Sequence, residues 1–217
     1  MVFVGREREA SRIASELTKG HNAVVSGPFG IGRTALVRRV AEQMGDGWRF
    51  VMLDFSHTPA ELCSALVAAL RGGGSRARRA PRSFVSARAA VLAFEPRGRR
   101  YVLVLDNVAT LTAPKLALLR RLAATGRYRF VAVAEPTLPD DELLELRACL
   151  FPTAAIVLLR LTAAATRSYF ARLSEALGLG WSEEEIAGLA AISGGYPLAM
   201  VEAASRARAR AARHGMT

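Results

Sequence analysis

Short apolar runs alternate along most of the chain with longer segments whose apolar residues recur every three or four positions. Runs rich in β-branched residues predict strands, and the three-to-four spacing predicts amphipathic helices. The predicted strands cover residues 23–25, 49–55, 101–105, 128–134 and 154–159. The predicted helices cover 6–19, 33–44, 114–124 and 139–150. One further helix begins at Pro59, and another ends near Phe94. This alternation predicts an α/β fold with a parallel sheet sandwiched by helices.

The pattern becomes purely helical after the last predicted strand. Thr162 and Ser182 can each cap a helix, and Pro197 can begin a third. We therefore expect two domains, an α/β domain over residues 1–161 and a small all-α domain over residues 162–217.

The most specific motif is the segment 27–34, Gly-Pro-Phe-Gly-Ile-Gly-Arg-Thr, between a predicted strand and a predicted helix. A loop of the form G-x-x-x-x-G-K-[ST] in this context turns its amide groups inward around phosphates. An ordinary glycine-rich turn is the alternative that this context disfavours. The predicted phosphate contacts are Gly27, Pro28, Phe29, Gly30, Ile31, Gly32, Arg33, Thr34 and Ala35.

Arginine occupies position 33, where this motif has lysine. A guanidinium is larger than an ammonium, planar, and prefers bidentate contacts, so the exchange is not conservative. The chain has 28 arginines and two lysines, and a general arginine bias also accounts for the exchange. Nucleotide binding can survive such a change where catalysis does not.

Asp106 follows the apolar run 101–105 and is predicted to hold Mg²⁺ through water, together with the Thr34 hydroxyl. The alternative for Asp106 is a turn or cap residue after a strand. Hydrolytic relatives have an acidic residue next, which acts as the base for the attacking water. Asn107 cannot accept a proton at a useful pKa. Two catalytic positions, 33 and 107, therefore depart from the pattern together.

These motifs, with the segments 3–9 and 194–199, resemble P-loop ATPases of the AAA+ and STAND group, especially archaeal-type ATPases related to origin-recognition and NB-ARC proteins. The resemblance implies an ASCE/AAA+-like sheet, ATP or ADP with Mg²⁺ as cofactors, and a helical lid that reports the γ-phosphate. It also implies that four residues lie near the adenine: Val4, Gly5, Arg6 and Pro197.

The resemblance suggests roles for two further residues. Glu135 follows a strand where relatives sense the γ-phosphate, and it is a candidate to replace the base missing at Asn107; the alternative is a turn residue before Pro136. Arg147 is a candidate arginine finger toward a neighbour in an oligomer, and the alternative is an ordinary surface arginine.

The formal net charge is +11, with basic clusters at 71–79, 97–100, 120–129 and 206–213. A basic surface attracts phosphate backbones, which makes DNA a partner to test. Against this, no base-reading module follows the lid, and arginine-rich coding also explains the charge. The glycine-rich segment 71–81 predicts a loop.

No apolar span reaches about twenty residues and no signal-peptide pattern begins the chain, so we expect a soluble cytoplasmic protein without membrane contact. Cys63 and Cys149 lack metal-ligand spacing with the histidines and are predicted to be buried thiols.

Two functions remain open. The first is a switch that binds ATP or ADP with slow or absent hydrolysis, which the paired departures at Arg33 and Asn107 favour. The second is an active ATPase that assembles on DNA as a homo-oligomer or with a partner protein, with Glu135 or another group as base. A pseudo-ATPase with an empty pocket is a third possibility.

Overall fold

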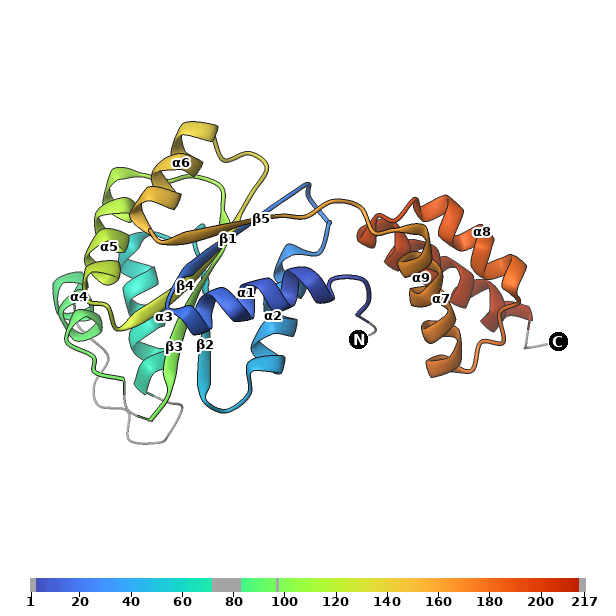
Figure 1. The fold of residues 1–217 in the computed structure, drawn as a ribbon, viewed down its shortest axis with the longest axis horizontal. Helices are drawn as coiled ribbons and strands as arrows, with labels where there is room; N and C mark the ends of the chain where they lie inside the picture. The colour runs from blue at the N-terminus through green and yellow to red at the C-terminus, as the bar shows by residue number, and fades with distance from the viewer. Residues whose placement is uncertain (1–2, 72–82, 97, 215–217) are drawn as a thin grey trace.

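The computed structural model describes residues 3–71, 83–96 and 98–214. Within them, a five-stranded parallel sheet has the order β2-β3-β4-β1-β5. The strands are β1 Asn22–Ser26, β2 Trp48–Asp54, β3 Arg100–Val108, β4 Tyr128–Ala134 and β5 Thr153–Val157. All carboxyl ends of the strands meet at one side of the sheet, which we call the carboxyl edge; the other side is the amino edge (Figure 1).

Helices cover both faces of the sheet, which explains why its central strands are almost continuously apolar. One face packs against α1 (Glu7–Lys19) and α2 (Arg33–Met44). The other packs against α3 (Pro59–Arg71), α4 (Phe84–Leu92), α5 (Ala113–Ala124) and α6 (Asp140–Cys149). Side chains alternate between the faces: Leu103 and Leu105 of β3 join one core, and Val102 and Val104 the other.

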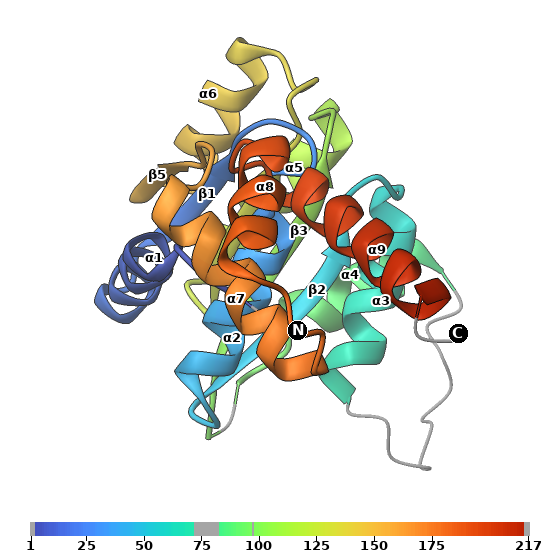
Figure 2. The same cartoon turned by 90° about the vertical axis from the view of Figure 1, so that its right-hand side faces the viewer.

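Three helices follow the sheet and form a separate small core: α7 (Ala163–Leu177), α8 (Glu183–Ser193) and α9 (Pro197–His214). We call them the helical segment. Thr162 accepts a hydrogen bond from the amide of Ala165, and Ser182 and Glu185 form a capping box. Figure 2 views the molecule from the side of these helices, which lie in front of the sheet.

The predicted fold class is confirmed, and the differences are local. The last predicted strand, 154–159, is too long at its end, because its only partner β1 finishes at Ser26. Cys63 is buried, but the prediction for Cys149 was wrong because that side chain is only half-buried; burial raises the pKa of both thiols. All of the predicted loop 71–81 except Arg71 lies outside the described residues.

The predicted domain division near Leu161 falls between the end of β5 and the start of α7, and it stays a prediction. In the described part of the chain, no helix combines the length and apolar composition needed to cross a lipid bilayer.

Candidate functional site

The glycine loop leaves β1 at the carboxyl edge and runs directly into α2. Its backbone needs glycine: φ is +145° at Gly27 and +75° at Gly30. A Cβ on Gly27 would also lie 2.8 Å from the carbonyl oxygen of Leu158. The side chains of Pro28 and Phe29 are exposed, whereas that of Ile31 is buried in the core, so Ile31 can offer a phosphate only its backbone.

The first turn of α2 offers amide groups to an anion. In the described residues, the amides of Arg33, Thr34 and Ala35 donate to no protein acceptor, and the first completed helical bond runs from Leu36 to Gly32. Free amides and the positive end of the helix dipole favour a phosphate at this position.

Arg33 is buried, with 6% of its side chain exposed, and its guanidinium is held by the end of β4. One nitrogen donates to the carbonyl oxygen of Ala134, and Nη2 lies 2.6 Å from Oε2 of Glu135. The sequence prediction placed both residues near the γ-phosphate but did not foresee that they pair. The structure therefore joins Arg33 and Glu135 into one ion pair, in which Arg33 is buried and Glu135 partly buried.

Thr34 and Asp106 also meet. The Thr34 hydroxyl donates to Oδ1 of Asp106 at 2.9 Å, which brings the start of α2 to the end of β3. Hydroxyl and carboxylate oxygens are the ligands that Mg²⁺ takes beside phosphates. These two residues fit a magnesium ion held partly through water, and their metal-binding role stays a prediction.

Asn107 reaches a residue that the sequence analysis did not single out. Its Nδ2 donates to Oδ1 of Asp54 at 3.2 Å, and its own φ is +59°. Asp54 ends β2 and is the register partner of Asp106. The predicted strand 49–55 contained Asp54; a carboxylate at the end of a strand was the signal that could have identified it.

An apolar pocket lies beside the loop, between the sheet and the helical segment. Its lining includes six predicted residues: Val4, Arg6, Ile31, Gly32, Ala35 and Pro197. It also includes four that the sequence did not indicate: Leu161, Tyr169, Met200 and Val201. Gly5, the remaining residue predicted to lie near the adenine, packs against α7, where an added Cβ would lie 2.7 Å from Cβ of Ala165.

The helical segment contacts the glycine loop directly. The amide of Leu198, at the start of α9, donates to the carbonyl oxygen of Gly30 at 3.2 Å. The amide of Leu161 donates to the carbonyl oxygen of Gly195 at 2.8 Å. A Cβ on Gly195 would lie 2.2 Å from the carbonyl oxygen of Leu161, so the Gly194-Gly195 pair lets the two backbones approach.

Arg147 lies away from this site. It is in the last turn of α6, and the carbonyl oxygen of Leu150 just beyond it accepts from Asn22 at the start of β1. That position is at the amino edge, whereas the glycine loop follows the end of β1. Arg147 therefore does not reach the site of its own chain, and a role toward a neighbouring chain stays a prediction.

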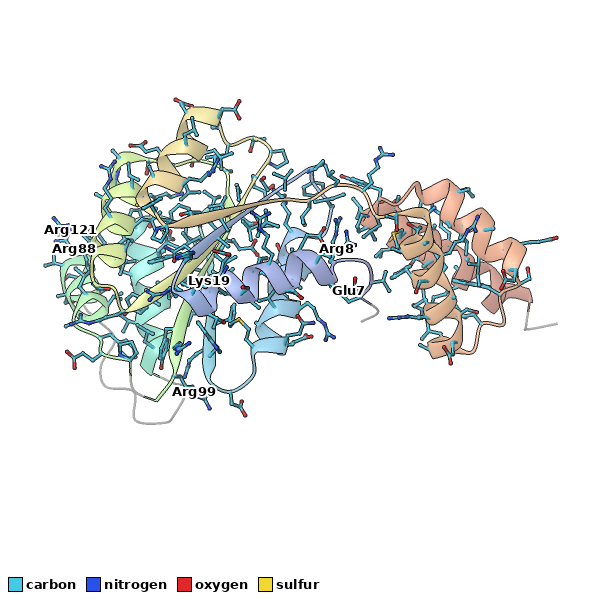
Figure 3. All side chains as sticks on the ribbon, in the orientation of Figure 1. Glu7, Arg8, Lys19, Arg88, Arg99 and Arg121 are labelled. Atoms are coloured by element: carbon cyan, nitrogen blue, oxygen red, sulfur yellow. The ribbon has the colours of Figure 1, made fainter. Side chains whose placement is uncertain are left out.

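Basic side chains gather in a groove at the amino edge. The guanidinium of Arg100 stacks 5.1 Å from the ring centre of Trp48. Glu16 and Glu95 balance part of the charge through ion pairs of 2.8 and 3.6 Å. Figure 3 labels Lys19 near the end of α1 and Arg99 ahead of β3. The basic residues of the groove are Lys19, Arg99, Arg100, Arg127 and Arg129.

The AAA ATPase domain family matches residues 2–133. Among solved structures, the chain is similar to the Aeropyrum pernix ORC1 protein in complex with DNA, with 19% identity, a TM-score of 0.66 and coverage of 96% of this chain and 66% of that one. It is similar to Cdc6p from Pyrobaculum aerophilum, with 19% identity, a TM-score of 0.65 and coverage of 90% and 59%. The Thermotoga maritima RuvB Holliday junction branch migration motor shows 17% identity, a TM-score of 0.61 and coverage of 95% and 62%.

At identities this low, the structural similarity establishes a shared fold and nothing more. The chain spans about two thirds or less of the length of these three proteins. No curated protein matches the sequence.

Proposed function

The chain belongs to the AAA ATPase domain family, and on that premise we propose that it is a nucleotide-dependent switch that binds ATP or ADP with Mg²⁺ and hydrolyses ATP slowly or not at all. The amides at the start of α2 would receive the phosphates, and the apolar pocket lined by Val4, Tyr169 and Pro197 would receive the base. Thr34 and Asp106 would hold Mg²⁺, which supplies charge neutralisation at the phosphates.

The observation that carries this proposal is that the Arg33 guanidinium is hydrogen-bonded to residues at the end of β4. Because Ala134 and Glu135 already bind its guanidinium, Arg33 cannot also give the γ-phosphate the undivided charge that a free lysine supplies. Asn107, at the position of the usual base, cannot take a proton from water. Both features slow the chemical step and leave the phosphate-binding amides intact.

A switch also needs a moving part that touches the ligand. The apolar pocket is shared by the sheet domain and the helical segment, and α9 is hydrogen-bonded to the loop through Leu198 and Gly30. A nucleotide seated there would contact both parts at once. Its affinity would then differ between arrangements of the helical segment, which is the requirement for a population shift.

Isothermal titration with ADP and ATP, with and without Mg²⁺, tests the proposal together with phosphate release over hours. We expect saturable binding of both nucleotides and turnover far slower than the median enzyme rate of about 10 s⁻¹. Asp106→Ala should remove the Mg²⁺-dependent part of the ATP affinity. Absence of binding would reject the switch and favour an empty pocket; rapid turnover would favour an active ATPase.

The basic groove at the amino edge favours association with DNA as a second function. It lies opposite the nucleotide site and brings together Arg99 and Arg100 with Arg127 and Arg129, from two of the predicted basic clusters. One of the similar proteins, the Aeropyrum pernix ORC1 protein, was solved in complex with DNA. Arginine and lysine in such a groove would neutralise backbone phosphates without reading bases.

Charge reversal tests this second function. Arg99→Glu with Arg100→Glu should weaken DNA binding and lower the slope of log affinity against log salt by about 1 for each phosphate that the variant no longer neutralises. Arg38→Glu with Arg121→Glu makes the same change in net charge at exposed positions on α2 and α5. Equal weakening in both variants would show that only the overall charge matters and that the groove is not the binding surface.

Oligomerisation would make Arg147 accessible to a neighbour's γ-phosphate. Nucleotide-dependent assembly in analytical ultracentrifugation, together with lower turnover in Arg147→Ala, would support that role. A protein that stays monomeric with ATP would contradict it.

A further inference from the structure

Two carboxylates lie side by side at the carboxyl edge of the sheet. Asp54 ends β2, and its register partner on β3 is Asp106. Neighbouring strands are about 4.8 Å apart, so the two residues stand next to each other at the end of the same ladder. Asp106 receives the Thr34 hydroxyl and belongs to the proposed magnesium site. Asp54 is therefore adjacent to that site without being part of it.

The hydrogen bonds of Asp54 leave one of its oxygens available. Ser56 donates to Oδ1 through its amide at 3.0 Å and its hydroxyl at 2.7 Å, and Asn107 donates to the same oxygen at 3.2 Å. Among the described residues, no donor reaches Oδ2, and the side chain is exposed. An ionised carboxylate oxygen in this state can accept a hydrogen bond from water.

Asp54 forms no ion pair among the described residues. Within the described residues, no cation lies within ion-pair distance of it; Lys115 instead donates to the carbonyl oxygen of Phe55 at 2.7 Å. The contrast with Glu135 is direct, since Oε2 of that residue lies 2.6 Å from the guanidinium of Arg33. Of these two candidate bases, Asp54 is the one whose carboxylate is not held in an ion pair with a guanidinium among the described residues.

Asp54 also lies close to the position where the catalytic base is missing. Asn107 stands where hydrolytic relatives are expected to have their base, and its amide touches the Asp54 carboxylate. A carboxylate is thus present within one hydrogen-bond length of the side chain that cannot act.

We propose that Asp54 is the catalytic base of the slow ATP hydrolysis, an assignment that rests on the proposed function. Oδ2 of Asp54 accepts a proton from the attacking water, and the water oxygen forms a bond to the γ-phosphorus. The bond between the γ-phosphorus and the bridging oxygen breaks, and ADP leaves with that electron pair. The proton passes from Asp54 to solvent after phosphate departs.

The surroundings of Asp54 are consistent with slow turnover. Hydrogen bonds from Ser56, first through the hydroxyl and then through the amide, hold the pKa of Asp54 below its usual value; Asn107 and the charge of His57 act in the same direction. The group is therefore ionised and can accept a proton, but a base whose pKa lies far below the working pH is weak.

The test is a comparison of Asp54→Asn with the unaltered protein, measuring phosphate release under single-turnover conditions and Mg²⁺-ATP affinity by titration. Loss of a general base costs about 10²–10⁴-fold in rate, so we expect at least the lower value with an unchanged affinity. Asp54→Glu keeps a carboxylate and should retain measurable turnover. Asp46→Asn, an exposed carboxylate in the turn before β2, should leave both quantities unchanged.

Three results would overturn the assignment. Turnover by Asp54→Asn equal to that of the unaltered protein would do so, as would loss of Mg²⁺-ATP affinity equal to the loss of rate, which would show a binding role. A protein that binds ATP tightly and releases no phosphate would also overturn it while leaving the proposed switch intact. Failure to bind any nucleotide would instead reject the proposed function itself.

Discussion

The carboxyl edge contains two polar pairs in different surroundings, and in each a nitrogen donor meets a carboxylate. The Arg33–Glu135 pair is shielded, with 6% and 18% of the two side chains exposed. The Asn107–Asp54 pair lies in solvent, and Asp54 keeps one oxygen without a protein donor. Removing one partner of a shielded ion pair costs much of the folding stability, whereas removing an exposed carboxylate costs little. Burial thus separates a carboxylate that holds the site together from one that is available to react.

Glu135→Ala should have the largest effect, because it leaves the Arg33 charge buried without its partner. Breaking a buried ion pair costs about 3–5 kcal/mol, whereas Asp54→Ala should cost less than about 1 kcal/mol at its exposed position. Urea denaturation measures both. Arg33→Met combined with Glu135→Leu should recover much of the stability, since no charge remains unpaired. Equal losses for Glu135→Ala and Asp54→Ala would remove the distinction between the two pairs.

Thr34→Val tests the contact that lies between the two pairs. Removing the hydroxyl should lower the Mg²⁺-dependent ATP affinity by about 1.5–3 kcal/mol, or about 10- to 150-fold, because the hydrogen bond that it removes involves the charged Asp106 carboxylate. Titration with and without Mg²⁺ separates this part from the rest of the affinity. Thr34→Ser keeps the hydroxyl and serves as the matched control. An equal loss in both variants, or a loss without Mg²⁺, would count against a magnesium role.

Asn107 has a positive φ, and substitution there tests how the exposed pair is held. Asn107→Val should destabilise the protein by about 1–2 kcal/mol, because a Cβ with branches crowds the following carbonyl in this conformation. Asn107→Gly should cost less, since glycine adopts this φ freely. Thermal unfolding of the two variants compares them. If Asn107→Gly lowers the stability as much as Asn107→Val, then loss of the hydrogen bond to Asp54, and not backbone strain, causes the destabilisation.

The smallest expected effect is the pH dependence from Asp54. Because its pKa is lower in the folded state than the value of about 3.9 in unfolded chains, Asp54 stabilises the fold above that pH. The contribution disappears as the pH falls through the lowered folded-state pKa. Stability measured against Asp54→Asn should therefore show a difference at neutral pH that shrinks below about pH 4. A difference that grows on acidification would reverse the sign of the inferred shift.

Much of the fold could be predicted from the sequence because its evidence is local. The spacing of apolar residues predicted the sheet and its two helical layers, and Thr162 and Ser182 predicted helix starts that the structure confirms. The end of β5 was missed because it depends on where β1 stops. An edge strand ends where its only partner ends, and the apolar pattern of its own residues does not contain that information.

The candidate site divides in the same way. The three glycines and the helix start follow one another within one short segment, and Asp106 directly follows its own apolar run, so local patterns in the sequence by themselves determined the phosphate loop and its family. Arg33 and Glu135 are 102 positions apart, and Asp54 and Asn107 are 53 apart. Only strand order and register bring such residues together, because the period of a strand specifies the face of each residue but not its neighbour. The tertiary structure therefore decided which carboxylate forms an ion pair and which keeps an oxygen without a protein donor.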